Sequence, residues 1–198
     1  MAAFTRGFRG RRSSDPALPP GQYTTNDFPV LSAGPTPRVE SDAWRFTITT
    51  VSGHQTELTW SELLALPSET PTVDIHCVTR WSKIATSWRG VSVDVVLSGI
   101  DVDGAYVMVE SYGGYTTNLP LVDIQGGKAW IAYQFEGEPL EPVHGGPARL
   151  LVPHLYFWKS AKWVRGLRFL ASDEPGFWEG LGYNMYGDPW REQRYTDD

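Results

Sequence analysis

The sequence predicts an α+β fold, a mixed and strand-rich domain with short helices and long loops. Several segments alternate apolar and polar residues, as half-buried strands do, whereas the segments with helical signals are short. Hydrophobic residues make up 41 % and charged residues 20 % of the 198 residues, a balance typical of a globular body with one sizeable core. We therefore expect a single domain over 18–198, preceded by a flexible arm over 1–17 that is rich in Arg, Gly and Ser.

The elements follow one another in short runs. Residues 44–51 alternate apolar and polar side chains and are predicted as a strand, which resumes after a turn at Gly53. Thr59 stands three residues before Glu62, the spacing of a capping box, so a short helix is expected from there to Leu66. Further strands are predicted at 72–77, 106–110, 116–121, 129–135, 148–152 and 163–170, with a short capped helix at 92–97.

The last part of the chain, residues 172–198, shows no periodic pattern. It is rich in Gly and in aromatic residues, which bury large areas when they pack on a domain. We expect it to form an irregular tail that belongs to the domain. Its aromatic residues include Phe177, Trp178, Tyr183, Tyr186 and Trp190.

Charge and composition exclude several classes of protein. The net charge of −6 is spread along the chain, so no global positive field attracts a nucleic acid. No run approaches the ~18 apolar residues that a membrane-spanning helix needs, so no direct membrane span is expected. Arg11 and Arg12 resemble part of a twin-arginine export signal, but no apolar segment follows them. We therefore expect a cytoplasmic protein.

The first segment that suggests chemistry is 76–82, where a predicted strand ends at the one cysteine of the chain, Cys77. Arg80 is close in sequence, and a nearby cation favours thiolate over thiol. A thiolate can act as a nucleophile or bind a soft metal. A zinc site is disfavoured, because the chain offers one Cys and four His without the usual ligand spacings. A Cys–His hydrolase with His76 or His144 as base stays open, although no spacing supports it.

The second such segment is 143–163, which combines glycines with cations. Glycines let a backbone come close to a ligand, and the planar fork of Arg149 suits a phosphate or a pterin oxygen. Lys159 and Lys162 add positive charge, and Ser160 adds a hydroxyl. This cluster suits one phosphorylated cofactor, with an ordinary solvated basic loop as the alternative. No Walker loop and no G-x-G-x-x-G motif occurs, so a nucleotide-binding fold is disfavoured.

Taken together, these segments resemble the molybdopterin-binding domain of the sulfite oxidase superfamily, most closely its short bacterial members. The likeness covers roughly residues 18–170 and keeps the order of the family's motifs, which makes it far more specific than any single motif. The matching segments are 18–22, 27–31, 74–82, 88–91, 114–121, 137–140 and 144–163.

The resemblance implies roles for individual residues. Cys77 stands where the family's molybdenum-ligating cysteine stands, and Tyr183 lies at about the place of an aromatic residue of the substrate pocket. Arg80 is the candidate to replace the arginines that surround sulfite in true sulfite oxidases. Cofactor contacts are expected from His144 and Arg149 to the pterin, from Ser160, Ala161 and Lys162 to its phosphate, with Lys159 beside them, and from Ser111.

The resemblance also implies a function. It predicts a molybdopterin-dependent oxidoreductase that performs two-electron oxygen-atom transfer on a small sulfur-containing substrate, either sulfite or sulfoxide-like. The haem domain of animal sulfite oxidases and the usual dimerisation domain have no counterpart in these residues. Electrons are therefore expected to pass to or from a separate carrier, a cytochrome or a membrane redox protein. The alternatives are a cofactor-binding module without turnover and the Cys–His hydrolase.

Overall fold

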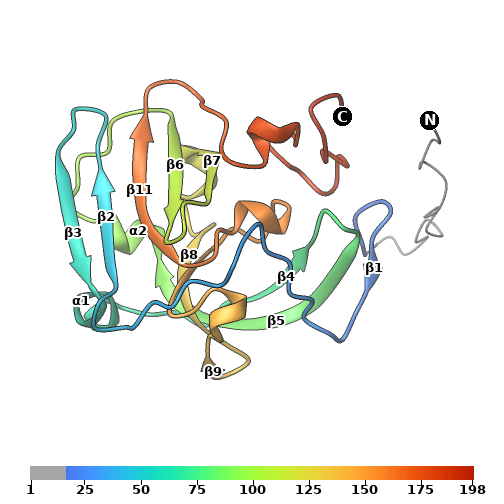
Figure 1. Cartoon of the computed structure of the whole chain (residues 1–198), viewed down its shortest axis with the longest axis horizontal. Helices are drawn as coiled ribbons and strands as arrows, with labels where there is room; N and C mark the ends of the chain where they lie inside the picture. The colour runs from blue at the N-terminus through green and yellow to red at the C-terminus, as the bar shows by residue number, and fades with distance from the viewer. Residues whose placement is uncertain (1–16) are drawn as a thin grey trace.

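The strand-rich α+β fold is confirmed in a computed structural model, which describes residues 17–198 and contains two sheets (Figure 1). The predicted arm therefore lies outside the described residues, apart from Ala17. Within those residues, no helix is both long and apolar enough to cross a membrane.

One sheet has five strands, which lie on the left in Figure 1. Neighbouring strands in this sheet are antiparallel, except for β2 and β11. These two run parallel, with Leu167 opposite Ile48. The first and last predicted strands of the chain thus lie side by side at its centre. In spatial order the strands are β3 (Gln55–Thr59), β2 (Arg45–Thr49), β11 (Val164–Leu170), β6 (Tyr106–Ser111) and β7 (Thr116–Pro120).

The other sheet is organised around β5 (Trp81–Ser92), which pairs with strands on both sides. The sequence did not predict this strand, because its alternation is interrupted. Trp81 and Ser82 are both buried, and Ala85 has a left-handed backbone with φ of 52°. Its partner strands and their neighbours are β1 (Tyr23–Thr24), β4 (Thr72–His76), β8 (Trp130–Phe135), β9 (Glu138–Pro139) and β10 (Arg149–Leu151).

The helices are short, as predicted. The helix α1 (Trp60–Ala65) begins at a capping box in which the Thr59 side chain accepts from the Glu62 backbone and Glu62 accepts from Thr59. The second helix, α2 (Val93–Val96), lies within the predicted range. Single turns of 3-10 helix follow at η1 (Leu121–Asp123), η2 (Pro142–His144), η3 (Phe157–Lys159) and η4 (Glu179–Leu181).

Two hydrophobic clusters fill the interior, one on each face of the sheet that contains β8. The larger cluster includes Ile131 and packs this sheet against the five-stranded sheet. Successive residues of a strand point to opposite faces, so Trp130 and Ala132 join the smaller cluster on the other side. The smaller cluster contains Cys77 and Phe157. Cys77, the predicted metal ligand, therefore belongs to a packed aromatic region and not to a loose loop.

Candidate active site

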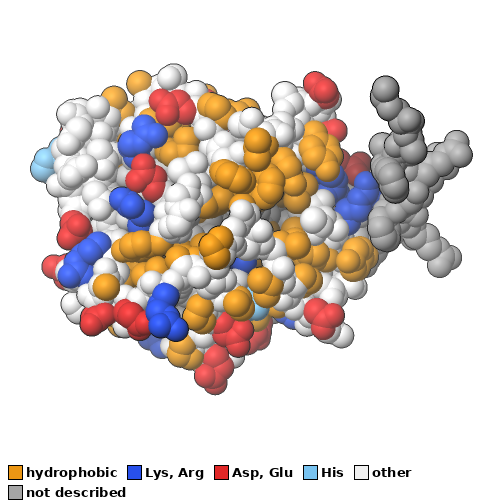
Figure 2. Space-filling model, in the orientation of Figure 1, with side chains coloured by type: hydrophobic (Ala, Val, Ile, Leu, Met, Phe, Trp, Pro, Cys, Tyr) orange, Lys and Arg blue, Asp and Glu red, His pale blue; other side chains and the backbone are white. Residues whose placement is uncertain are grey.

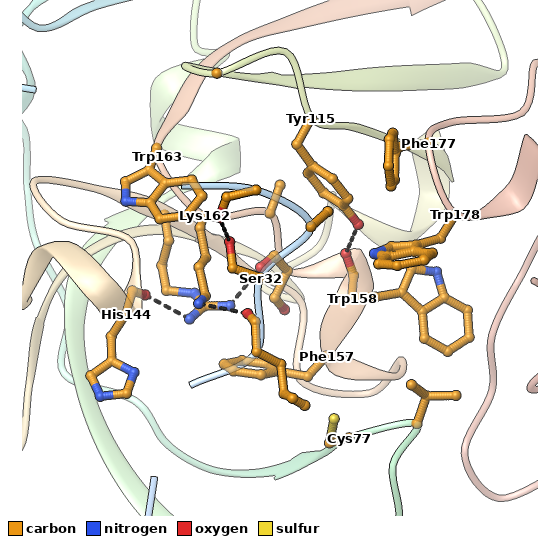
Figure 3. A pocket seen from close by; sticks show the side chains of 18 of the residues that line it. Ser32, Cys77, Tyr115, His144, Phe157, Trp158, Lys162, Trp163, Phe177 and Trp178 are labelled. Carbon is orange, nitrogen blue, oxygen red and sulfur yellow. Dashed lines mark hydrogen bonds between the residues drawn. The ribbon is translucent and has the colours of Figure 1, made fainter. Parts of the chain in front are cut away.

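A cavity of about 480 Å³ brings together segments that are far apart in the sequence (Figure 3). Its walls come from the stretch 28–37, the turn after β4, the turn between β6 and β7, the stretch 157–163 and the C-terminal tail. Of the predicted site residues, the lining includes Cys77, His144, Arg149, Ser160, Ala161, Lys162 and Tyr183.

Cys77 is the first residue after β4, and a tight turn presents its sulfur to the cavity. The backbone N–H of Cys77 donates to Trp81, and the N–H of Arg80 donates back to the carbonyl of Cys77. Arg80 adopts a left-handed φ of 80° to close this turn. The Sγ of Cys77 lies 3.1 Å from Oγ1 of Thr79. Burial raises the pKa of the Cys77 thiol, and Thr79 and Arg194 oppose that shift.

The cation that acts on Cys77 is Arg194 and not Arg80. Arg80 is exposed and is absent from the cavity lining, so the expected place of its side chain beside the substrate does not fit this geometry. Arg194 is buried and donates 2.7 Å from Nη1 to the carbonyl of Val78, next to Cys77. The sequence carries no local signal for this contact, because Arg194 lies more than a hundred residues away in the tail.

Arg149 is a buried cation without a carboxylate partner. It is 1 % exposed, its guanidinium donates to the carbonyls of His144 and Ser160, and it lies 4.0 Å above the ring of Phe157. None of the ion pairs formed within 17–198 includes it. Burial lowers its pKa to about 9. A buried charge normally has a partner, so this position favours an anionic ligand.

Lys162 faces the same cavity as Arg149. Its Nζ donates to the carbonyls of Leu31 and Val143, and it also forms no ion pair with a carboxylate of the described chain. Burial and the charge of Arg149 lower its pKa to about 8. A second cation whose charge Arg149 disfavours makes this part of the cavity suitable for an anionic group such as phosphate.

His144 and Ser160 complete this end of the cavity. The ring of His144 stacks on Phe28 at 3.9 Å, and its buried Nδ1 has no hydrogen-bond partner within residues 17–198. Burial, followed by Lys162 and Arg149, lowers the pKa of His144, so the ring favours its neutral form. The hydroxyl of Ser160 accepts from the backbone of Val152. An unpartnered ring nitrogen beside two cations fits a polar, anionic ligand.

Two predicted contacts lie outside the cavity lining. Lys159 is completely buried behind the wall, where its Nζ lies 2.6 Å from Glu179 and donates to Asn118 and Met185. Its donors are used within the protein, so the expectation that it contacts a cofactor does not fit the structure. Ser111 is also buried, and the lining residue is its neighbour Tyr112.

The opposite end of the cavity is aromatic, and sequence reasoning predicted only Tyr183 there. The rings of Tyr183 and Trp158 pack edge to face, with their centroids 5.2 Å apart. The ring of Trp178 is tilted against that of Tyr183, with a centroid distance of 5.1 Å. The Tyr115 hydroxyl donates to the carbonyl of Trp158. We call this group the aromatic end, which consists of Tyr115, Trp158, Phe177, Trp178 and Tyr183.

The side chains around the cavity fit a metal that a cofactor already binds. No group of three or more His, Cys, Asp or Glu in residues 17–198 is arranged to hold a metal ion. The thiol of Cys77 is thus a single sulfur donor at the cavity, which suits a metal that a cofactor already holds. His76 bonds Ser82 through Nδ1, and the side-chain hydrogen bond of Cys77 is to Thr79, so the described structure provides no Cys–His pair for a hydrolase.

Comparison with known proteins shows the family of the chain. Residues 33–178 match the family described as oxidoreductase molybdopterin binding domain. The chain is 43 % identical over 196 residues to an uncharacterized oxidoreductase of Bacillus subtilis, YuiH, which covers 96 % of this chain and 99 % of that protein. It is 27 % identical to a putative protein-methionine-sulfoxide reductase subunit of Azospira oryzae, YedZ1, over 75 % of this chain and 57 % of that protein.

A solved structure shares the fold. The sulfane dehydrogenase SoxCD from Paracoccus pantotrophus superposes with a TM-score of 0.62 at 22 % identity, over 69 % of this chain and 40 % of that chain. This likeness concerns the fold alone, whereas the family match covers most of the chain and includes the segments around Cys77 and Arg149. The resemblance to the sulfite oxidase superfamily is confirmed, and the chain belongs to the family of oxidoreductases with a molybdopterin-binding domain.

Proposed function

We propose that the protein transfers an oxygen atom to or from a small sulfur-containing substrate, in a two-electron reaction. The observation that supports this most directly is the placing of one soft donor, Cys77, in the same cavity as the unpaired cations Arg149 and Lys162. A cofactor with a metal that accepts a thiolate at one end and a phosphate at the other matches both groups.

In this proposal Cys77 is the protein ligand to molybdenum, and Arg149 and Lys162 hold the phosphate. Ser160 and Ala161 lie beside them in the wall, and the unpartnered nitrogen of His144 is available to the pterin. The bound cofactor supplies the oxygen-transfer chemistry. The chain would bind it and orient it against the sulfur of Cys77.

The proposed substrate class draws support from the relatives. One relative is named for methionine sulfoxide and the structural neighbour for sulfane, and both are sulfur compounds. The match covers only 57 % of the Azospira oryzae protein, so the electron-transfer partners of that protein are not assigned to this chain. Electrons would be exchanged with a separate one-electron carrier, a cytochrome or a membrane redox protein. A cytoplasmic location is part of the same proposal.

The test is metal analysis of protein expressed with ample molybdate, followed by a visible spectrum and a substrate screen with an artificial electron donor or acceptor. Stoichiometric molybdenum, visible absorption and turnover support the proposal. Bound pterin without turnover would indicate a cofactor-binding module. Activity that needs no metal and disappears on thiol alkylation would indicate the hydrolase.

A further inference from the structure

The turn that carries Cys77 is held from outside by two buried side chains, Gln22 and Arg194, which are far from it in the sequence. Nε2 of Gln22 donates to the carbonyl of Cys77 at 3.0 Å. Nη1 of Arg194 donates to the carbonyl of the next residue, Val78, at 2.7 Å. We propose that Gln22 and Arg194 are positioning residues, which hold this turn in one conformation and fix the sulfur of Cys77 for the metal of the bound cofactor. This inference rests on the proposed function of the cavity.

The first argument is that this turn has a backbone conformation that needs support. It is a three-residue loop between β4 and β5, in which the N–H of Arg80 donates to Cys77 and the N–H of Cys77 donates to Trp81. The last residue of such a loop is left-handed and is commonly glycine. Here it is Arg80, with a φ of 80°. A non-glycine residue in this region is strained, and it persists only where the surrounding structure holds it.

The second argument is a peptide unit that connects Arg194 to the sulfur. This unit joins Val78 to Thr79 at the centre of the turn, and its two possible orientations distinguish β-turns of types I and II. Its carbonyl belongs to Val78 and accepts from Arg194. Its N–H belongs to Thr79 and is a hydrogen-bond donor to the sulfur of Cys77. A flip of the unit would break both contacts, so Arg194 preserves a hydrogen bond at the sulfur, and such bonds tune a bound metal.

The third argument is that Arg194 is itself fixed and has no carboxylate partner. Its guanidinium lies 4.8 Å from the centroid of the Tyr156 ring, and Nη2 donates to the carbonyl of Pro20 at 3.4 Å. Its backbone N–H donates to the side chain of Asp198. None of the ion pairs formed within the described part of the chain includes Arg194. Its charge therefore remains available to the thiolate of Cys77, which it favours.

Gln22 holds the other carbonyl of the turn. The carbonyl of Cys77 already accepts from the N–H of Arg80, so the amide of Gln22 takes its second lone pair. Oε1 of Gln22 accepts from the hydroxyl of Ser82 at 3.4 Å, and that hydroxyl bonds Nδ1 of His76 at 2.8 Å. Gln22 is completely buried. Because both ends of its amide have partners in the hairpin, the amide has one orientation, and it fixes the carbonyl of Cys77.

Both positioning residues lie outside residues 33–178, which match the family. Gln22 precedes β1, and Arg194 belongs to the C-terminal tail. The two segments meet at Gly21, where an added Cβ would lie 3.2 Å from Oε1 of Glu192 and 3.7 Å from Nη2 of Arg194. The matched region thus supplies the sulfur ligand, and the flanking segments supply the side chains that hold its turn.

The test is a redox titration of molybdenum-loaded protein followed by EPR spectroscopy, which measures the metal and not turnover. Arg194→Met removes the charge and the donors but keeps a long side chain. We expect this variant to retain molybdenum, because Arg149 and Lys162 still hold the cofactor. Its midpoint potential should shift to lower values, because a nearby cation favours the more electron-rich, reduced metal. The EPR signal of the one-electron-reduced metal should split into more than one species, because the turn is no longer held in one conformation.

Further variants separate charge from geometry. Arg194→Lys keeps the charge and a donor, so it should restore most of the midpoint potential. Gln22→Met removes a neutral donor, so it should split the EPR signal and change the potential less than Arg194→Met does. Where Arg194→Met does not fold, as judged by urea denaturation, Arg194→Gln replaces it and should also lower the potential. Arg191→Met is the matched control, because Arg191 is an exposed arginine of the same tail.

A wild-type EPR signal and potential in molybdenum-loaded Arg194→Met and Gln22→Met would overturn the inference, even if both variants unfold at lower urea concentrations. The same shift in Arg191→Met as in Arg194→Met would also overturn it, because the effect would then come from the general charge of the tail. Either result would leave the proposed function intact. Wild-type protein that holds no molybdenum would instead reject the proposed function itself, so the two failures are distinguishable.

Discussion

The ammonium of Lys159 lies 2.6 Å from Oε1 of Glu179, and both side chains are fully buried. Glu179 also accepts from Thr117 and from the indole of Trp158. This network ties the C-terminal tail to β7 and to the cavity wall, beneath the aromatic end. The tail is therefore part of the active-site architecture, although it lies in the segment for which the sequence predicts no regular structure.

Removal of Lys159 should destabilise the fold. Lys159→Met leaves the carboxylate of Glu179 buried without its cation, and breaking a buried pair costs about 3–5 kcal/mol of unfolding free energy. Urea denaturation measures this loss. Lys128→Met is the control, because Lys128 is exposed and should change stability by less than about 0.5 kcal/mol. A loss below about 1 kcal/mol in Lys159→Met would contradict the importance of the pair.

Arg149→Ala should lower cofactor content. The substitution removes a buried cation from the proposed phosphate site, together with its hydrogen bonds to His144 and Ser160. We expect at least a tenfold drop in molybdenum per chain, measured by metal analysis. Arg165→Ala removes an exposed arginine of β11 and should retain wild-type molybdenum. Equal occupancy in the two variants would exclude Arg149 from the phosphate site.

Local signals explain what the sequence predicts correctly. The start of α1 depends on two residues, Thr59 and Glu62, that are close in the chain, so the spacing alone identifies it. Cys77 is equally local, because the strand before it ends where the apolar pattern ends. The strand β5 was missed, since Ser82 and Thr86 are buried polar residues that hide its alternation.

Long-range pairing explains what the sequence does not predict. The sequence shows that Lys159 is a cation in a basic segment, but it does not show that Glu179 folds back to pair with it. Arg194 and Val78 are 116 residues apart in the sequence, and only the fold brings them within hydrogen-bonding distance. Figure 2 shows apolar side chains gathered on one face of the molecule, a grouping that no local sequence pattern predicts.

Cofactor affinity should decrease at alkaline pH. Burial and Arg149 lower the pKa of Lys162 to about 8, and a bound phosphate would raise that pKa again. Between about pH 7 and pH 8 the free protein already carries the charge, and the phosphate, whose second pKa is about 6, is fully ionised, so affinity is nearly constant there. Above about pH 8, Lys162 must take up a proton on binding, and affinity falls by up to about tenfold per pH unit. Molybdopterin retained after dialysis at pH values on either side of 8 measures this.

Lys162→Gln provides the control for that pH dependence. This variant should bind the cofactor more weakly at neutral pH. Its affinity should not change with pH until about pH 9, where Arg149, whose pKa is lowered to about 9, begins to lose its proton. The other titratable groups near Lys162 are His144, which favours the neutral form at these pH values, and Cys77. The same slope in Lys162→Gln as in the wild type would assign the effect to a different group.

Cys77→Ser should abolish turnover while the protein stays folded. Serine preserves the size of the side chain and its hydrogen bond to Thr79, so we expect a stability change of less than about 1 kcal/mol. It replaces the sulfur donor by a hydroxyl oxygen, so the metal–thiolate bond and its electronic effect on the metal are lost. Visible absorption from the metal–thiolate bond should disappear, whereas pterin content, held by Arg149 and Lys162, should be retained in large part. A Cys77→Ser protein that keeps both its visible spectrum and its activity would show that the metal is bound elsewhere.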